Sequence, residues 1–262
     1  MKNILITNPL KDILHLRLND EYKKNALSFE LISNLIEEIE LAQIKDSYKV
    51  IIIASSGNVF SSGHDLQEIK NARNESDQGQ GFFKELFLLC SRLMQTIVGC
   101  HIPVIAEIDG IATAAGCQLV ASCDLAIASE SSQFATPGVN IGLFCSTPMV
   151  ALSRNVSKKN AMKMLLTGEM IDSVEAKRIG LINDYCQKDK LSDEVFKLAK
   201  IIASKSNETI KIGKKAFYEQ TELDLEEAYK FTSEIMAKNL LDYDAIEGIN
   251  AFLDKRKPNW KK

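Results

Sequence analysis

The sequence predicts a mixed α/β fold, with a core of strands and helices followed by an all-helical C-terminal region. Continuous apolar runs rich in β-branched residues, typical of strands buried in a parallel sheet, alternate with amphipathic helical patterns in the first half of the chain. From residue 158 onward, only helical periodicity remains. A length of 262 residues suits one large core with an appendage.

The first quarter of the chain predicts two short strands, at residues 4–7 and 13–18, and then an amphipathic helix. The helix begins at Ser28, a residue type that caps helix N-termini, and ends near Asp46. Its apolar positions recur at helical spacing: Ile32, Leu35, Ile36 and Ile39. A continuous apolar run at residues 50–54 then predicts a strand buried on both faces.

The remaining pattern continues this alternation and then becomes helical. A helix at residues 82–98 precedes strands at residues 103–108 and 124–128. The later helices are predicted at residues 160–166, 173–179 and 192–204, in a segment through Ala216, and at residues 223–240 and 245–253. We therefore divide the chain into a core of residues 1–195 and a helical C-terminal region of residues 196–262.

Charge and hydropathy argue against two classes of partner. The 32 basic and 35 acidic residues give a net charge of -3, which provides no general attraction for a polyanion, so nucleic acid is not a predicted partner. Residues 131–153 carry no charge, but they contain two prolines, two glycines and several hydroxyl groups that would be unpaired in lipid. We expect no membrane span there and interpret the segment as the wall of a buried pocket.

The cysteines and the N-terminus predict a compartment. Six cysteines are spread through the chain without a Cys-x-x-Cys pair, which indicates free thiols in a reducing environment. The first 18 residues carry Lys2, Lys11 and Asp12 and resemble neither a signal peptide nor a transit peptide. The sequence therefore predicts a cytoplasmic protein.

Two segments share a strand, a loop of small residues and the start of a helix. In the first, Ser61, Ser62 and Gly63 lead into His64; in the second, residues 112–116 lead into a helix. Small residues allow close approach to the backbone, and the first N–H groups of a helix lack internal partners. Two such starts together could hold one oxyanion, although tight packing alone also explains each loop.

The order of motifs along nearly the whole chain resembles the crotonase, or enoyl-CoA hydratase/isomerase, superfamily. The matching segments are residues 25–28, 60–66, 109–119, 123–128, 134–138 and 248–257. The resemblance implies a spiral of ββα turns and a helical C-terminal region that builds a homotrimer or a dimer of trimers. It also implies a role in fatty-acid or acyl-CoA metabolism with an acyl-CoA thioester as ligand, so that CoA is part of the substrate and neither a separate cofactor nor a metal is expected.

The resemblance also assigns roles to individual residues. It places the two oxyanion-binding N–H groups on His64 and Ala115, where they would stabilise a thioester enolate, and it makes Gln118 the third candidate catalytic residue. Lys23 and Lys24 match contacts to the CoA phosphates, and Phe252 and Lys255 match contacts to the CoA of a neighbouring subunit. The other implied substrate-binding residues are Ser62, Gly63, Asp65, Leu66, Gly116, Pro137 and Gly138.

The sequence departs from the family where hydratases use two glutamates. Those positions hold Gln118 and Gly138, neither of which can act as a general acid or base, so efficient hydration is not expected. Gln118 either orients a substrate or satisfies buried backbone, and the role of the His64 ring stays open. Glu107 is either a displaced acid or a residue that faces outward or pairs with a cation. The alternatives are an enzyme resembling methylmalonyl-CoA decarboxylase, or a non-catalytic protein that binds acyl-CoA.

Overall fold

A computed structural model describes residues 3–261, which contain two β-sheets, eleven α-helices and three short 3-10 helices. The larger sheet has the order β1-β2-β3-β5-β7-β10; β1 is antiparallel to β2, and the other neighbours are parallel. Its strands are β1 Leu5–Leu10, β2 Ile13–Leu18, β3 Val50–Ser55, β5 Val104–Ile108, β7 Leu125–Ser129 and β10 Asp184–Cys186.

The smaller sheet has the order β4-β6-β8-β9 and consists of very short strands. These are β4 Val59–Ser61, β6 Ile111–Thr113, β8 Gln133–Ala135 and β9 Ile171–Asp172. Each of the first three follows a strand of the larger sheet within a few residues, and the next element along the chain after it is helical. The chain therefore winds through successive turns of strand, strand and helix, as the predicted ββα spiral requires.

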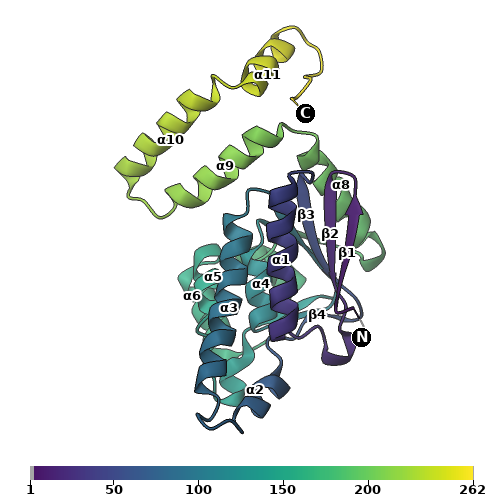
Figure 1. Cartoon of the computed structure of the whole chain (residues 1–262), viewed down its shortest axis with the longest axis vertical. Coiled ribbons are helices and arrows are strands. Elements are labelled where there is room, and N and C mark those ends of the chain that lie inside the picture. The colour runs from purple at the N-terminus through teal and green to yellow at the C-terminus, as the bar shows by residue number, and fades with distance from the viewer. Residues whose placement is uncertain (1–2, 262) are drawn as a thin grey trace.

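Helices cover both faces of the larger sheet (Figure 1). On one face, α1 and α3 pack against alternate residues of β2, β3 and β5; on the other face, α8 packs through Leu191, Val195 and Ala199. The helices that precede the C-terminal region are α1 Phe29–Lys45, α2 Leu66–Ala72, α3 Gln80–Gly99, α4 Ala115–Ser122, α5 Pro148–Asn155, α6 Lys158–Thr167, α7 Ser173–Ile179 and α8 Leu191–Ala203. The 3-10 helices are η1 Glu21–Lys23, η2 Pro137–Ile141 and η3 Lys188–Lys190.

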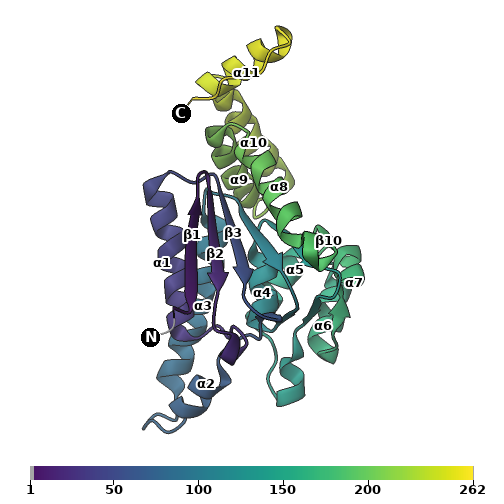
Figure 2. The same ribbon diagram turned by 90° about the vertical axis from the view of Figure 1, so that its right-hand side faces the viewer.

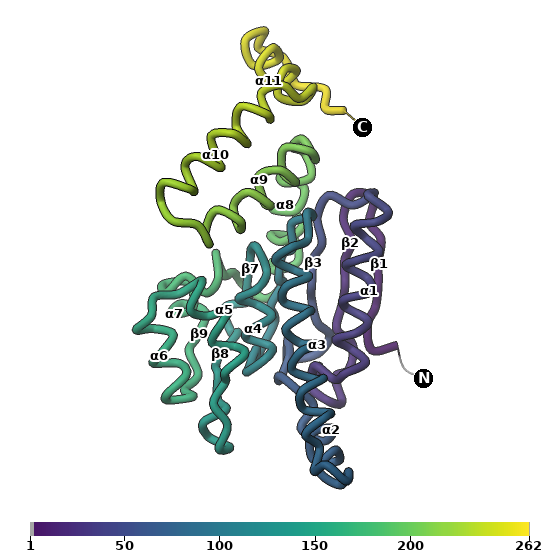
Figure 3. Tube along the Cα trace, turned by 60° about the vertical axis from the view of Figure 1, so that its left-hand side comes forward, coloured from purple at the N-terminus to yellow at the C-terminus, as the bar shows by residue number. Residues whose placement is uncertain are grey.

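The last three helices extend beyond the end of the sheet, as Figures 2 and 3 show. They are α9 Asn207–Gln220, α10 Leu225–Asn239 and α11 Tyr243–Leu253. The boundary expected between residues 195 and 196 falls inside α8, which packs on the sheet. The helices that project from the core therefore begin only at Asn207.

A buried polar network fixes α9 to the core. The Nζ of Lys214 lies 2.7 Å from the Asp124 carboxylate and also donates to two backbone carbonyls near the end of α3. The hydroxyl of Tyr218 donates to the other oxygen of Asp124 at 2.9 Å. Because both charged side chains are largely buried, they must stay paired for the helix to remain docked.

The end of the chain returns to the junction between α8 and α9. The Trp260 indole N–H donates to the carbonyl of Ser204 at 2.9 Å, and the backbone N–H of Lys261 donates to Asp244 at 2.7 Å. Asp244 is buried and also accepts a hydrogen bond from Ser206. These contacts hold α11 in place. Across residues 3–261, we find no helix with the length and apolarity that a membrane span requires.

Candidate functional site

The small sheet brings the two predicted loops together. Because β4 and β6 are parallel neighbours, with Ser61 opposite Ala112, the loops that follow them leave the sheet side by side. A Cβ at Gly63 would lie 2.8 Å from the Cβ of Ala114 and 3.3 Å from the backbone nitrogen of Ala115. With its φ of +89°, Gly63 occupies a position that only glycine fills without strain.

Two backbone N–H groups at this contact have no acceptor in the described chain: those of His64 and Ala115. Their neighbours are engaged, since Leu27 N–H donates to the Gly63 carbonyl at 2.7 Å and Ala114 N–H donates to Ala135 at 2.9 Å. Ala115 is the first residue of α4, where the helix dipole favours negative charge. The loops thus present two adjacent unpaired donors.

Backbone strain accompanies this arrangement. Ala114 has φ 50° and ψ -118°, a conformation that a residue with a Cβ seldom adopts and that costs on the order of 1–3 kcal/mol. Behind it, Gly116 lies so close to β4 that a Cβ would be 2.4 Å from the carbonyl oxygen of Ser61. The fold therefore forces the start of α4 against the first loop.

The loop before α2 is anchored by polar contacts. Asn25 is fully buried, and its side-chain N–H groups donate to the carbonyls of Ser56 and Val59 at 2.8 and 2.7 Å. Asp65 caps α2 and pairs with the Nζ of Lys23 at 2.8 Å. Burial of the Asp65 carboxylate opposes its ionisation, but the hydrogen bonds from Lys23 and from the start of α2 hold its pKa below the ordinary value.

This ion pair separates the roles of the two predicted CoA-phosphate contacts. Lys23 is committed to Asp65, whereas Lys24 is exposed and has no ion pair among residues 3–261. Ser62 and Leu66, on either side of Gly63 and His64, are both exposed. Of the two lysines, Lys24 is the one whose charge remains available to an anion.

Gln118 lies buried in α4, with 4% of its surface exposed. Its Oε1 lies 3.9 Å from the Sγ of Cys90 on α3, within reach of a weak S–H hydrogen bond. Burial raises the pKa of Cys90 to about 12, so the sulfur keeps its proton at neutral pH. The Nε2 of Gln118 has no acceptor in the described chain.

Gly138 lies buried in η2, directly after Pro137, and has no space for a side chain. A Cβ there would lie 2.5 Å from the carbonyl oxygen of Leu143 and 2.8 Å from the Sγ of Cys145. The backbone N–H of Leu143 also donates to the Gly138 carbonyl at 2.9 Å. A glutamate at this position would therefore require the 143–145 segment to move.

The His64 ring is held by its surroundings. Nδ1 lies 3.4 Å from the carbonyl oxygen of Leu27, and the ring meets the Phe87 ring edge-on with centroids 5.3 Å apart. Burial lowers the pKa of His64, which makes the neutral imidazole the stable form near pH 7. Nδ1 then donates to Leu27, and Nε2 is buried without a partner in the described chain.

Three other predicted features lie away from these loops. Phe252 is in α11 and Lys255 follows it, both at the far end of the C-terminal region (Figure 1). Glu107 is buried with its carboxylate 3.8 Å from the Nε2 of His15, on the sheet face that α8 covers. Glu107 therefore faces the interior beside His15 rather than solvent, and the two facing atoms make no hydrogen bond in the described chain.

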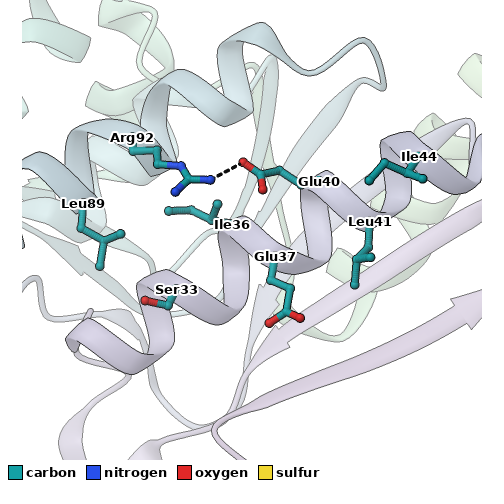
Figure 4. Close-up of a pocket in the computed structure, with 8 residues that line it drawn as sticks. All are labelled: Ser33, Ile36, Glu37, Glu40, Leu41, Ile44, Leu89 and Arg92. Carbon is teal, nitrogen blue, oxygen red and sulfur yellow. Dashed lines mark hydrogen bonds and ion pairs between the residues drawn. The ribbon is translucent and has the colours of Figure 1, made fainter.

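A separate surface groove lies between α1 and α3, and an ion pair between Arg92 and Glu40 spans it (Figure 4). The groove has a volume of about 300 Å³, and the two charged groups are 2.8 Å apart. None of the predicted site residues lines it. The sequence did not single out two residues that support the candidate site, Phe87 and Cys90, and they have no local signal. Asn25 stood within a matching motif, and Cys145 lies in the uncharged segment that we interpreted as a pocket wall.

Known proteins resemble this chain over most of its length. A family model described as enoyl-CoA hydratase/isomerase matches residues 10–262. Rat enoyl-CoA hydratase domain-containing protein 3, mitochondrial, is 45% identical over 260 residues, which are 99% of this chain and 81% of the rat protein. The crystal structure of the human protein of that name has a TM-score of 0.94 at 46% identity, covering 98% of this chain and 100% of its own. An enoyl-CoA hydratase structure from Mycobacterium smegmatis has a TM-score of 0.94 at 41% identity, covering 99% of each chain.

These comparisons confirm one prediction and correct another. The resemblance to the crotonase superfamily is confirmed, and the interpretation of residues 112–124, 134–140 and 142–147 as similar to enoyl-CoA hydratase domain-containing protein 3 agrees with the name of relatives about 45% identical to the whole chain. The prediction of a cytoplasmic protein is wrong, because the rat, mouse and human relatives are all named mitochondrial. That prediction used free thiols, which indicate a reducing environment but do not identify a compartment.

Proposed function

Because this chain belongs to the enoyl-CoA hydratase/isomerase family, we propose that it binds an acyl-CoA thioester and stabilises the enolate of that thioester. The thioester oxygen would accept hydrogen bonds from the backbone N–H groups of His64 and Ala115. The observation that carries the proposal is the contact between the two loops, in which Gly63 packs against Ala115 and both N–H groups lack an acceptor in the described chain.

The physical basis is electrostatic. When a proton or a carboxyl group leaves the carbon beside the thioester, negative charge develops on the carbonyl oxygen. Donors fixed in advance at that oxygen stabilise the transition state, and each contributes about 2.7–4 kcal/mol. The strained backbone at Ala114 supports this role, because such strain persists where the fold imposes a defined geometry.

The side chains around the donors favour chemistry that depends mainly on the enolate. Gln118 cannot titrate, and the space that a side chain at Gly138 would need is taken by Leu143 and Cys145. A positioned acid or base usually contributes about 10²–10⁴-fold, so hydration by a pair of glutamates is not the proposed reaction. Decarboxylation needs neither group: the C–C bond breaks, its electron pair enters the enolate, and carbon dioxide leaves.

The same observations favour a second candidate, a non-catalytic protein that binds acyl-CoA. Gln118 is neutral at every relevant pH, and the His64 ring is neutral near pH 7 and hydrogen-bonded to Leu27. A protein with these residues could keep its ligand without changing it. We therefore propose a role in acyl-CoA metabolism, either as an enzyme or as a binding protein. Whether a product forms from the bound thioester distinguishes the two.

The C-terminal helices support a homotrimer, or a dimer of trimers. Large apolar side chains are exposed along α9, α10, α11 and their connections: Phe217, Leu225, Tyr229, Met236, Leu240, Leu241, Tyr243, Ile246, Ile249, Phe252 and Leu253. So much exposed apolar surface is typical of an interface. In such an assembly, Phe252 and Lys255 would contact CoA bound to a neighbouring subunit. Sedimentation equilibrium tests this proposal, and a monomer at micromolar concentration would contradict it.

The proposed chemistry is tested by incubating the protein with enoyl, malonyl and saturated CoA thioesters in heavy water and measuring products by mass spectrometry. Hydration, decarboxylation, isomerisation and thioester hydrolysis give different mass changes. Ala115→Pro removes one donor at the first position of α4; because proline also restricts the residue before it, the strained Ala114, circular dichroism checks that the variant folds. Lys158→Pro is the matched control, because Lys158 is the first residue of α6.

The outcomes separate the candidates. A product that forms with the native protein and with Lys158→Pro, but not with Ala115→Pro, supports an enzyme with the proposed donors. Binding of thioesters without any product supports the binding protein. If no CoA thioester binds, or if Ala115→Pro retains full activity, the proposed site is wrong.

A further inference from the structure

The Gln118 side chain has an unusual hydrogen-bonding state for a buried amide. A primary amide has two N–H donors and an acceptor oxygen, and a buried donor left without a partner costs about 1–3 kcal/mol. Here the oxygen faces the Cys90 thiol at 3.9 Å, while Nε2 has no acceptor among residues 3–261. Nε2 is not fully enclosed by the protein, so a ligand can reach it.

The Cys90 thiol determines which end of the amide faces the site. A protonated thiol is a donor, so it favours the amide oxygen over the amide nitrogen as its neighbour. Cys90 is buried in α3, with no exposed surface, and it holds this contact from a helix that packs on α4. The unpaired N–H₂ group is therefore directed away from α3.

The helix geometry places this amide beside the proposed oxyanion donors. Gln118 lies three residues after Ala115, a rise of about 4.5 Å along α4. Side chains of a helix lean toward its N-terminus, so that of Gln118 covers the turn that begins at Ala115. If the thioester carbonyl occupies the donors of His64 and Ala115, the next carbons of the acyl group extend over this turn.

We propose that the Gln118 amide recognises an oxygen acceptor on C3 of the acyl group, and that Cys90 is the residue that orients it. The ligand class is then acyl-CoA thioesters oxygenated at C3, which includes 3-oxoacyl, 3-hydroxyacyl and malonyl groups. A saturated acyl group would leave the buried N–H₂ group unpaired and would bind less tightly. This inference rests on the proposed function.

Calorimetric titration of the full-length protein tests the inference. Four probes share the CoA moiety and differ at C3: butyryl-CoA, 3-hydroxybutyryl-CoA, acetoacetyl-CoA and malonyl-CoA. We expect the best of the three oxygenated ligands to bind about tenfold more tightly than butyryl-CoA, as one satisfied buried hydrogen bond implies. The ranking among those three identifies a keto, hydroxyl or carboxylate oxygen as the preferred acceptor.

Variants separate recognition from general packing. Gln118→Leu removes the donors at similar volume, so it should abolish the tenfold preference for an oxygenated acyl group over butyryl-CoA. Cys90→Ala should reduce the preference about threefold, and Cys90→Ser, which keeps a donor, should restore it. Cys123→Ala is the matched control, because Cys123 is a buried cysteine at the other end of α4 and should leave the preference unchanged.

Each result has a defined meaning. Equal affinity of the wild-type protein for all four ligands, or a preference that survives Gln118→Leu, overturns this inference while the proposed function stands. Failure of every thioester to bind overturns both. Circular dichroism confirms folding of each variant, and Gln118→Met replaces Gln118→Leu if the leucine variant does not fold.

Discussion

Replacing Gly63 with alanine tests whether the contact between the two loops creates the site. The substitution adds one methyl group at a position with φ +89°, which costs an L-residue about 1–2 kcal/mol in the left-handed region. It also places that methyl 2.8 Å from the Cβ of Ala114 and 3.3 Å from the nitrogen of Ala115. Because Ala114 already has a strained backbone, the loops would separate by a few tenths of an ångström or more.

The expected functional loss is larger than the loss of stability. A misplacement of about 1 Å in a catalytic arrangement can cost about 100-fold, so Gly63→Ala should lower kcat/KM, or thioester affinity for a non-catalytic protein, by a factor approaching this. Gly180→Ala is the matched control. Its φ is +86°, but the nearest neighbour of the new methyl is the Asn155 carbonyl oxygen at 3.5 Å, an ordinary contact.

Both variants carry the same conformational penalty, and only one touches the site. Urea unfolding followed by circular dichroism should show similar losses for the two variants, about 1–2 kcal/mol, with the steric contact adding to the loss in Gly63→Ala. Calorimetry or a turnover assay then measures function on the folded proteins. Equal function in Gly63→Ala and Gly180→Ala would refute the claim that the loop contact positions the donors.

Three further predictions follow from the buried groups. Lys214→Met leaves the Asp124 carboxylate without its buried basic partner, which should lower the free energy of unfolding by about 3–5 kcal/mol. Urea titration measures this loss, and a change below about 1 kcal/mol would show that the pair is dispensable. Because burial raises the pKa of Cys90 to about 12, its thiolate is scarce at pH 8. Iodoacetamide should therefore modify the half-buried Cys186 first and Cys90 only after unfolding, which peptide mass spectrometry measures. Early labelling of Cys90 would contradict its burial. Burial lowers the pKa of His64 below its ordinary value, which favours the neutral ring at neutral pH. A plot of ligand affinity against pH should therefore show no inflection from His64 between pH 6.5 and 8. An inflection in that range that disappears in His64→Gln would contradict the lowered pKa.

The sequence predicted the large elements well because their patterns are long. The helix observed at Phe29–Lys45 and the strand at Val50–Ser55 differ from the expected bounds by one residue at each end or less. The second sheet was not predicted, because strands of two or three residues, such as Ile111–Thr113, have no measurable period. Yet this sheet places the two loops side by side, so the decisive contact of the site depends on the part of the fold with the weakest local signal.

Individual site residues show the same limit. The sequence identified Gln118 and Gly138 as departures from a family pattern, but their surroundings come from residues distant in the chain or across a turn. Cys90 is 28 positions from Gln118, and nothing in the local pattern of α3 marks it as a partner of an amide. The segment that fills the space beside Gly138 is likewise set by tertiary packing.

The position of Trp260 has a spectroscopic consequence. It is the protein's one tryptophan, and its indole N–H donates to the carbonyl of Ser204 at the junction of α8 and α9. Intrinsic fluorescence excited at the indole band therefore reports whether the chain terminus is seated, not whether the core is folded. A denaturation curve read at this wavelength would describe detachment of the C-terminal helices, and any gap between it and the circular dichroism curve would measure how independently those helices come away.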